Sequence, residues 1–210
     1  VYGQYAQWDD NRAKIKTLFR LFKENGYALY GGGKIFHHGK EVHDDPAFDE
    51  ILPFTYSGWP KGGTQKAGFL RYARHHLKEE EMPDYKLASW CIEKLGENHE
   101  HPVFVVAGIF KPHTPLWIPQ EFFDLYPLDK IVVPTPPADE LEDVPAWGKR
   151  LANREDRYDP VMESGRAQEI VQAYLAAISF VDNQVGRLVD AVERSPQAQN
   201  TIVVLWSDHG

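Results

Sequence analysis

The stretch PVFVVAGIFKPH, residues 102–113, gives the clearest indication of the fold. The run 102–110 is almost entirely apolar, which is typical of a strand that is covered on both faces of its sheet. Lys111 and His113 follow directly, at the point where the strand should end. The stretch therefore predicts a buried parallel strand that leads into a polar loop.

Three amphipathic helices are predicted, each ahead of a strand-like run. In chain order, the helix and strand pairs are 12–26 with Tyr27–Tyr30, 83–95 with 102–110, and Ala167–Val192 with Thr201–Trp206. Alternation of this kind favours a mostly parallel sheet flanked by helices, with right-handed crossovers between the strands. We therefore expect an α/β fold.

The remaining segments carry weaker patterns. Residues 35–82 are expected to be irregular, apart from a short helix around Phe69–Leu77. A long Pro-rich, acidic connection follows at Pro127–Ser164, and connections of that length are either functional or surface excursions. Its carboxylates are expected to be solvated; they are Asp139, Glu140, Glu142 and Asp143.

Composition excludes several classes of protein. The 210 residues are 42% hydrophobic and 26% charged, which is typical of a globular protein, and no apolar run is long enough to span a membrane. A formal charge of −8 without a basic cluster argues against nucleic acid as a partner. The single cysteine, Cys91, excludes an internal disulfide framework and a cysteine-type zinc site. The sequence indicates no oligomeric state.

Polar side chains follow each of the three predicted strands. The segments are GGGKIFHHGK after the first strand, KPHTP after the second and SDHG after the third. Ligands of open α/β sheets bind at the carboxyl ends of the strands, so we expect these residues to lie within about 10 Å of one another. Lysine, imidazole and carboxylate together suit an anionic substrate beside a divalent cation. The candidate residues are Lys34, His37, His113, Asp208 and His209.

Two other patterns do not support a site. GGGK is not a Walker phosphate-binding loop, because that motif requires Gly at position 28 and Ser or Thr at 35, where the chain has Ala28 and Ile35. Asp9 and Asp10 precede a helix and are interpreted as caps or solvated residues. The remaining histidines are interpreted as structural or solvated: His43, His75, His76, His99 and His101.

Five motifs together carry a family resemblance that covers nearly the whole chain. They are ENGY, GKIFHHG, AGIFKPHTPLWIPQEFFDLYP, SFVDNQVGRL and SDHG. The chain resembles the sulfatase family of the alkaline phosphatase superfamily, in particular its iduronate 2-sulfatase-like branch. In that branch two residues separate the GK motif from its histidine, as Ile35 and Phe36 do here. The resemblance implies hydrolysis of a sulfate ester, with a sulfated sugar as the substrate.

The resemblance also implies roles for the candidate residues. Lys34 and His37 would contact the sulfate group and the nucleophile, and His113 would contact sulfate or assist the leaving alcohol. Asp208 and His209 would bind a calcium ion, and His209 would also contact the substrate. No role is implied for Lys111.

Several family features are missing from this sequence. The family's nucleophile is a formylglycine made from the Cys or Ser of a C/S-x-P-S/A-R motif, and Cys91 is instead followed by Ile92 and Glu93. The paired aspartates after the family's first strand are missing too. We therefore expect residues 1–210 to be an internal part of one sulfatase N-terminal α/β domain, truncated at both ends and inactive alone. By the same resemblance the parent protein would be exported to the periplasm, the exterior or a lysosome.

Two alternatives stay open at this point. The first is a phosphodiesterase or phosphonate hydrolase of the same superfamily, with a different nucleophile. The second is a non-catalytic protein that binds calcium or a sulfated glycan.

Overall fold

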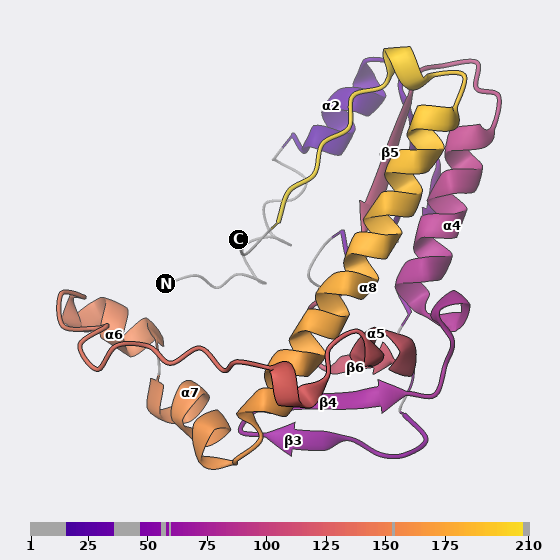
Figure 1. Cartoon of the computed structure of the whole chain (residues 1–210). Helices are drawn as coiled ribbons and strands as arrows, with labels where there is room; N and C mark the ends of the chain where they lie inside the picture. The colour runs from indigo at the N-terminus through magenta and orange to yellow at the C-terminus, as the bar shows by residue number, and fades with distance from the viewer. Residues whose placement is uncertain (1–15, 36–46, 56–57, 59, 153, 208–210) are drawn as a thin grey trace. The chain divides into compact units, whose positions relative to one another are not determined.

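The computed structural model describes residues 16–35, 47–55, 58, 60–152 and 154–207 (Figure 1). These residues form two compact units, which are described one at a time. The first unit combines Val1–Thr55, Leu87–Ile109 and Arg187–Gly210, and the second combines Tyr56–Lys86 and Phe110–Gly186.

A parallel sheet organises the first unit. Its strands are β1 Ala28–Gly33, β2 Glu50–Leu52 and β5 Val103–Gly108, in the order β2-β1-β5. Both pairings are parallel, and Gly33 lies opposite Gly108 at the carboxyl ends of β1 and β5. The prediction of a mostly parallel sheet with flanking helices is confirmed, and so are the strands predicted at 27–30 and 102–110.

The glycines of β1 permit close packing against neighbouring elements. Gly33 has a φ of 74°, and a Cβ atom there would lie 2.2 Å from the Gly108 carbonyl oxygen and 2.5 Å from Leu87. A Cβ atom on Gly32 would lie 2.7 Å from Leu87. Only glycine allows β1, β5 and the helix that carries Leu87 to approach this closely.

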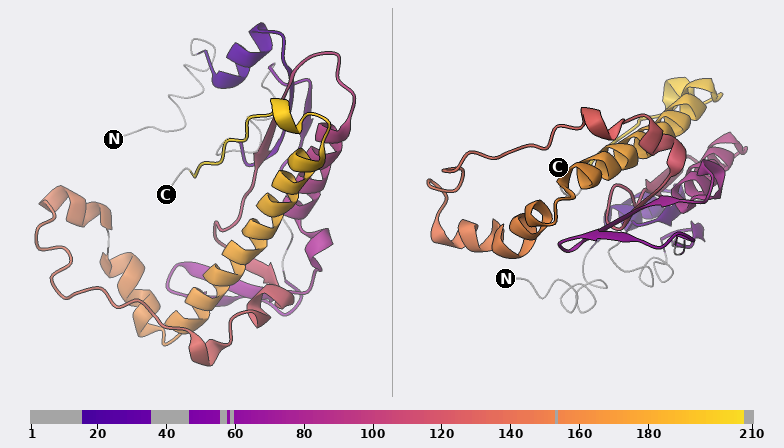
Figure 2. Two further views of the ribbon diagram at one scale, coloured as in Figure 1. Left: turned by 45° about the horizontal axis from the view of Figure 1, so that its top comes forward. Right: turned by 60° about the horizontal axis from the view of Figure 1, so that its bottom comes forward.

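Helices pack against this sheet as the periodicity predicts. Helix α2, Leu18–Glu24, is capped by the Thr17 side chain, and its Phe22 ring stacks on Phe104 of β5 at 4.5 Å. Figures 1 and 2 show the later turns of α4, Pro83–Gly96, beside those of α8, Ala167–Arg194. Their contact includes a hydrogen bond of 2.6 Å from the Arg187 guanidinium to the Ser89 hydroxyl.

The second unit is built on a mixed sheet. Its strands are β3 Gln65–Ala67, β4 Leu70–His75 and β6 Leu116–Pro119, with β3 antiparallel and β6 parallel to β4. Helix α5, Gln120–Asp124, follows β6 directly. The core lies between these elements and the apolar face of α8; its buried residues are Ala67, Tyr72, Met82, Leu116, Ile118, Phe122, Phe123, Ile170, Ala173, Ala176, Ala177 and Phe180.

Short helices occupy much of the Pro-rich connection, which was predicted to be a loop. They are the 3₁₀-helix η2 Leu128–Lys130 and the α-helices α6 Ala146–Ala152 and α7 Arg154–Glu163. The four carboxylates between η2 and α6 are exposed, as predicted. Two further 3₁₀-helices, η1 Glu79–Glu81 and η3 Ala198–Asn200, complete the described elements.

Two sequence predictions of secondary structure are wrong. The helix expected around Phe69–Leu77 is strand β4, in which Tyr72 and His75 are buried within the sheet rather than on a helix face. The strand expected at Thr201–Trp206 forms no strand pairing among the described residues, and its apolar side chains are exposed, with Ile202 at 90%. Residues 201–206 favour a strand by composition, but they pair with no neighbouring strand among the described residues.

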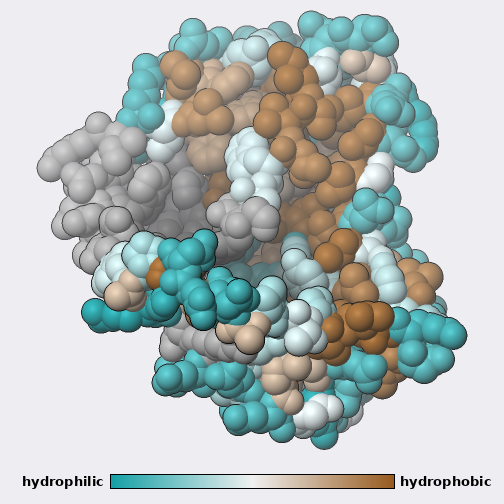
Figure 3. Space-filling model, turned by 60° about the vertical axis from the view of Figure 1, so that its left-hand side comes forward, coloured by the Kyte–Doolittle hydropathy of each residue, from teal (hydrophilic) through white to brown (hydrophobic). Residues whose placement is uncertain are grey.

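Apolar side chains gather over a broad area of one face of the molecule (Figure 3). The exposed large apolar residues of the first unit are Leu18, Leu21, Ile202, Val203, Val204, Leu205 and Trp206. Among the described residues, no helix is long and apolar enough to cross a membrane.

The close approach of β1 and β5 predicts a specific sensitivity to substitution. Gly33→Ala places a left-handed residue against the Gly108 carbonyl, whereas Gly26→Ala changes a glycine of similar φ, 83°, with no atom within 4 Å of the added Cβ. Both variants should lose about 1–2 kcal/mol of unfolding free energy from backbone strain, and Gly33→Ala about 1–3 kcal/mol more from overpacking. Chemical denaturation measures the unfolding free energy of both variants. Equal losses for Gly33→Ala and Gly26→Ala would contradict the close packing of β1 against β5.

Candidate functional site

Lys34 directly follows the last residue of β1, at the carboxyl edge of the parallel sheet. Its backbone N–H donates to the Gly108 carbonyl of β5 at 2.6 Å, which fixes the main chain at this point. The side chain is half-buried. An ammonium group at the carboxyl edge of parallel strands is suitably placed to bind an anionic ligand.

His113 lies on the loop after β5, which begins with a tight turn. Its backbone N–H donates to the Phe110 carbonyl at 3.1 Å, and its ring lies 4.9 Å from the Phe110 ring between centroids. The ring Nδ1 lies 2.5 Å from the Thr114 carbonyl oxygen. A carbonyl only accepts, so Nδ1 must carry the proton of this bond. Nε2 is then the ring atom that can exchange a proton with a substrate on the exposed side.

Two buried ionisable groups support the backbone of this loop. Asp84, in the first turn of α4, accepts the N–H groups of Phe110 at 2.9 Å and Lys111 at 3.1 Å. The Lys111 ammonium donates to the Pro115 carbonyl at 2.5 Å. Burial raises the pKa of Asp84, and burial lowers the pKa of Lys111 to about 8. Each charge partly offsets the desolvation of the other.

The structure tests the predicted convergence only in part. His37, Asp208 and His209 lie outside the described residues, as do Asp9, Asp10, His38 and His43. Lys34 and His113 are described, but they belong to different units. The clustering of the candidate residues therefore stays a prediction.

Three of the histidines that were interpreted as structural or solvated, His75, His76 and His99, have backbone partners. His75 is buried, and its Nδ1 accepts the Leu77 N–H at 3.1 Å. His76 accepts the Lys61 N–H at 3.1 Å through Nδ1, and His99 contacts the Lys94 carbonyl at 2.7 Å. Within 16–35, 47–55, 58, 60–152 and 154–207, no group of three or more His, Cys, Asp or Glu could hold a metal ion.

Cys91 is fully buried in α4, and burial raises the pKa of its thiol to about 12. The reactive form of cysteine is the thiolate, which is not populated near neutral pH at such a pKa. Cys91 is therefore a core residue rather than a nucleophile.

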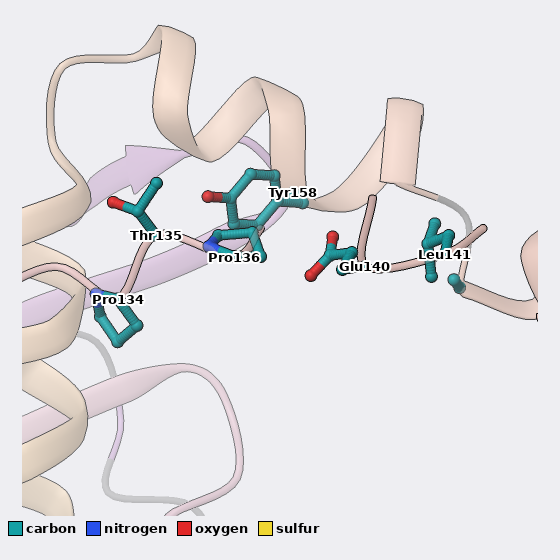
Figure 4. Close-up of a pocket in the computed structure, with 7 residues that line it drawn as sticks. Pro134, Thr135, Pro136, Glu140, Leu141 and Tyr158 are labelled. Atoms are coloured by element: carbon teal, nitrogen blue, oxygen red, sulfur yellow. The ribbon is translucent and has the colours of Figure 1, made fainter. Parts of the chain in front are cut away.

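A pocket of about 460 Å³ lies in the Pro-rich part of the second unit. Figure 4 shows its proline and leucine side chains together with the Tyr158 hydroxyl and the Glu140 carboxylate. Its lining is mostly apolar and consists of Pro134, Thr135, Pro136, Glu140, Leu141, Ala152 and Tyr158. None of the candidate site residues belongs to it.

Comparison with known proteins identifies the family. A family described as Sulfatase matches residues 2–210 of the chain. The chain belongs to the sulfatase family. The motifs GK and KPH, which contain Lys34 and His113, thus lie within a sulfatase domain that extends over almost the whole sequence.

Several curated sulfatases are similar to this chain. A protein named Sulfatase from Formosa agariphila is 38% identical over 96% of the chain and 43% of its own length. Iduronate 2-sulfatase from Mus musculus and from Homo sapiens are each 29% identical over 100% of the chain and 43% of their own length. The chain therefore spans less than half the length of these relatives.

Solved structures show the same fold. The structure of Ps i-CgsB has a TM-score of 0.51 at 18% identity, and it covers 90% of this chain and 38% of that one. The complex of Ps i-CgsB with k-i-k-neocarrahexaose has a TM-score of 0.50 at 17% identity. These likenesses confirm the α/β fold with a mostly parallel sheet and flanking helices.

The sequence reasoning missed Asp84 as part of the His113 loop. Pro83 followed by Asp84 is a recognisable start of a helix, since proline and acidic residues favour the first turn. The bonds from Asp84 to the backbone 26 and 27 residues later are long-range contacts. No local signal could have revealed them.

The lowered pKa of Lys111 predicts a pH dependence of stability. Between about pH 8 and its ordinary value of 10.5, the unfolded chain binds more protons at Lys111 than the folded chain does. The unfolding free energy of the wild type, relative to Lys111→Met, should therefore rise by about 2 kcal/mol between pH 7 and pH 10. Urea denaturation at both pH values measures this. A difference between wild type and Lys111→Met that stays the same at both pH values would refute the effect of burial.

Proposed function

We propose that this chain is part of a sulfuric ester hydrolase and supplies one side of its sulfate-binding site. The observation that carries the proposal is the sulfatase family match over residues 2–210, with Lys34 and the His113 loop directly following parallel strands. The relatives are more than twice as long as the chain, and we propose that residues 1–210 are an internal part of a comparable protein.

The described residues would act on the sulfate ester in two ways. The Lys34 ammonium would neutralise charge on the sulfate oxygens, where stabilisation of the transition state is most effective. His113 holds its Nδ1 proton on the Thr114 carbonyl, so Nε2 would exchange the proton with the leaving alcohol. His37 would contact sulfate and the nucleophile from the segment after β1.

The proposal also includes a calcium site and a nucleophile, neither of which lies among the described residues. The Asp208 carboxylate, with His209 beside it, is a hard oxygen ligand of the kind that suits calcium. A calcium ion held there would neutralise charge on the bound sulfate, and a formylglycine elsewhere in the longer protein would supply the nucleophile.

The proposed substrate is a sulfated sugar or polysaccharide. Two relatives are named as iduronate 2-sulfatases, and a protein of the same fold is described in complex with neocarrahexaose. The same relatives are the basis for proposing that the longer protein is exported.

Turnover of an aryl sulfate by the longer protein tests this function. His113→Ala should lower kcat/KM by about 10²-fold or more, because it removes a proton-transfer group. Asp208→Ala should abolish the part of the turnover that depends on added calcium. His76→Ala is the control, since His76 contacts the Lys61 backbone and the His75 ring and should retain wild-type turnover.

Two results would contradict the proposal. One is a wild-type protein with no turnover of any sulfate ester but with turnover of phosphate diesters or phosphonates. The other is a His113→Ala variant as active as the wild type, which would remove His113 from the chemistry.

A further inference from the structure

We propose that Asp84 and Lys111 are a pair of positioning residues that hold the loop of residues 110–115 in the geometry His113 needs. The inference rests on the proposed role of His113 in sulfate ester hydrolysis. Neither residue would touch the substrate, and both would act through the backbone of the loop.

Asp84 fixes the beginning of the loop. Its two carboxylate oxygens each accept one backbone N–H, from Phe110 and from Lys111. Asp84 is only 4% exposed, so water does not compete for these bonds. Hydrogen bonds to an ionised acceptor are stronger than neutral ones, and two of them on adjacent peptide groups restrict the orientation of both.

Lys111 fixes the end of the same loop. Its ammonium donates to the Pro115 carbonyl, one residue before β6 begins. The Lys111 side chain is 7% exposed and its ammonium lies 5.1 Å from the Phe110 ring centroid. The donor is therefore held in place by packing as well as by its hydrogen bond.

His113 lies between these two attachments and is exposed. Phe110, whose backbone N–H donates to Asp84, also contacts the His113 ring through its own ring, at 4.9 Å between centroids. The attached ends and this ring contact together restrict where Nε2 of His113 can point. The buried pair thus orients an exposed catalytic group without touching the reacting atoms, which is the role of a supporting shell in a preorganised site.

The charges of the pair predict that their effects are coupled. Each buried charge partly offsets the desolvation of the other, so removing one group leaves the remaining charge less compensated, and removing both groups avoids that cost. Asp84→Asn and Lys111→Met keep the approximate size of each side chain. The combined variant should therefore lose less activity than the product of the two single losses.

The kinetic test uses the longer protein and an aryl sulfate. Asp84→Asn and Lys111→Met should each lower kcat about 10- to 100-fold, since small misplacements of a catalytic group have effects of this size. KM should change less than about threefold, because the sulfate-binding ammonium of Lys34 is retained. Lys111→Arg retains the charge and donors and should recover most of the loss. Asp129→Asn and Lys130→Met, at an exposed pair on η2, are the matched controls and should remain at wild-type kcat.

A second measurement reports on the loop without any turnover. Amide hydrogen exchange of Phe110 and Lys111 should accelerate at least tenfold in Asp84→Asn relative to amides in the core of α8, which exchange through global unfolding. Unchanged exchange at these two amides would overturn the pair's structural role. Accelerated exchange with unchanged kcat, in a protein whose His113→Ala variant is inactive, would overturn its effect on His113. A wild-type protein without sulfatase activity would instead refute the proposed function. Amide hydrogen exchange at Phe110 and Lys111 would then decide by itself whether Asp84 holds the loop.

Discussion

The close contact of β1 with β5 is the constraint on which the first unit depends. Gly33 can face the Gly108 carbonyl only because neither residue carries a side chain at that point, and the Lys34 N–H then donates to the same carbonyl. A carbonyl that is partly shielded from water at a strand end needs a donor, and here Lys34, the residue after β1, provides it. The register of the sheet thereby determines where the Lys34 side chain leaves the sheet edge.

In the second unit, a side chain satisfies backbone groups that lie beyond a strand end. The N–H groups of Phe110 and Lys111 lie beyond the last pairing of β5, and the Asp84 carboxylate takes the place of a neighbouring strand. Placing a carboxylate and an ammonium in a buried position costs desolvation, which is visible in the shifted pKa values of both groups. A hydrophobic pair could not satisfy these backbone groups, which explains why a buried carboxylate and ammonium occur at the loop that carries His113, the proposed proton-transfer group.

Sequence patterns predicted the elements whose burial is periodic or continuous. The 28-residue helix α8, the helix α4 and the strands β1 and β5 all have such patterns. Strand β4 was predicted as a helix, and its segment is ambiguous because Leu70, Ala73 and Leu77 fall at helical spacing. Strands β2 and β3 are only three residues long, too short for a clear pattern. The sequence predicted Lys34 and His113 at strand ends, whereas Asp84 depended on a tertiary contact that no local pattern encodes.

The central proposal is that, in the longer protein, the residues after β1 and those after β5 would bind one sulfate group. A crystal structure of the longer protein with inorganic sulfate or a slowly hydrolysed sulfate ester measures this most directly. The account predicts Lys34 Nζ and His113 Nε2 both within about 4 Å of oxygens of the same sulfate group, a distance at which charged hydrogen bonds form. A sulfate bound elsewhere, with Lys34 and His113 separated by more than about 10 Å, the scale of a ligand pocket, would contradict it.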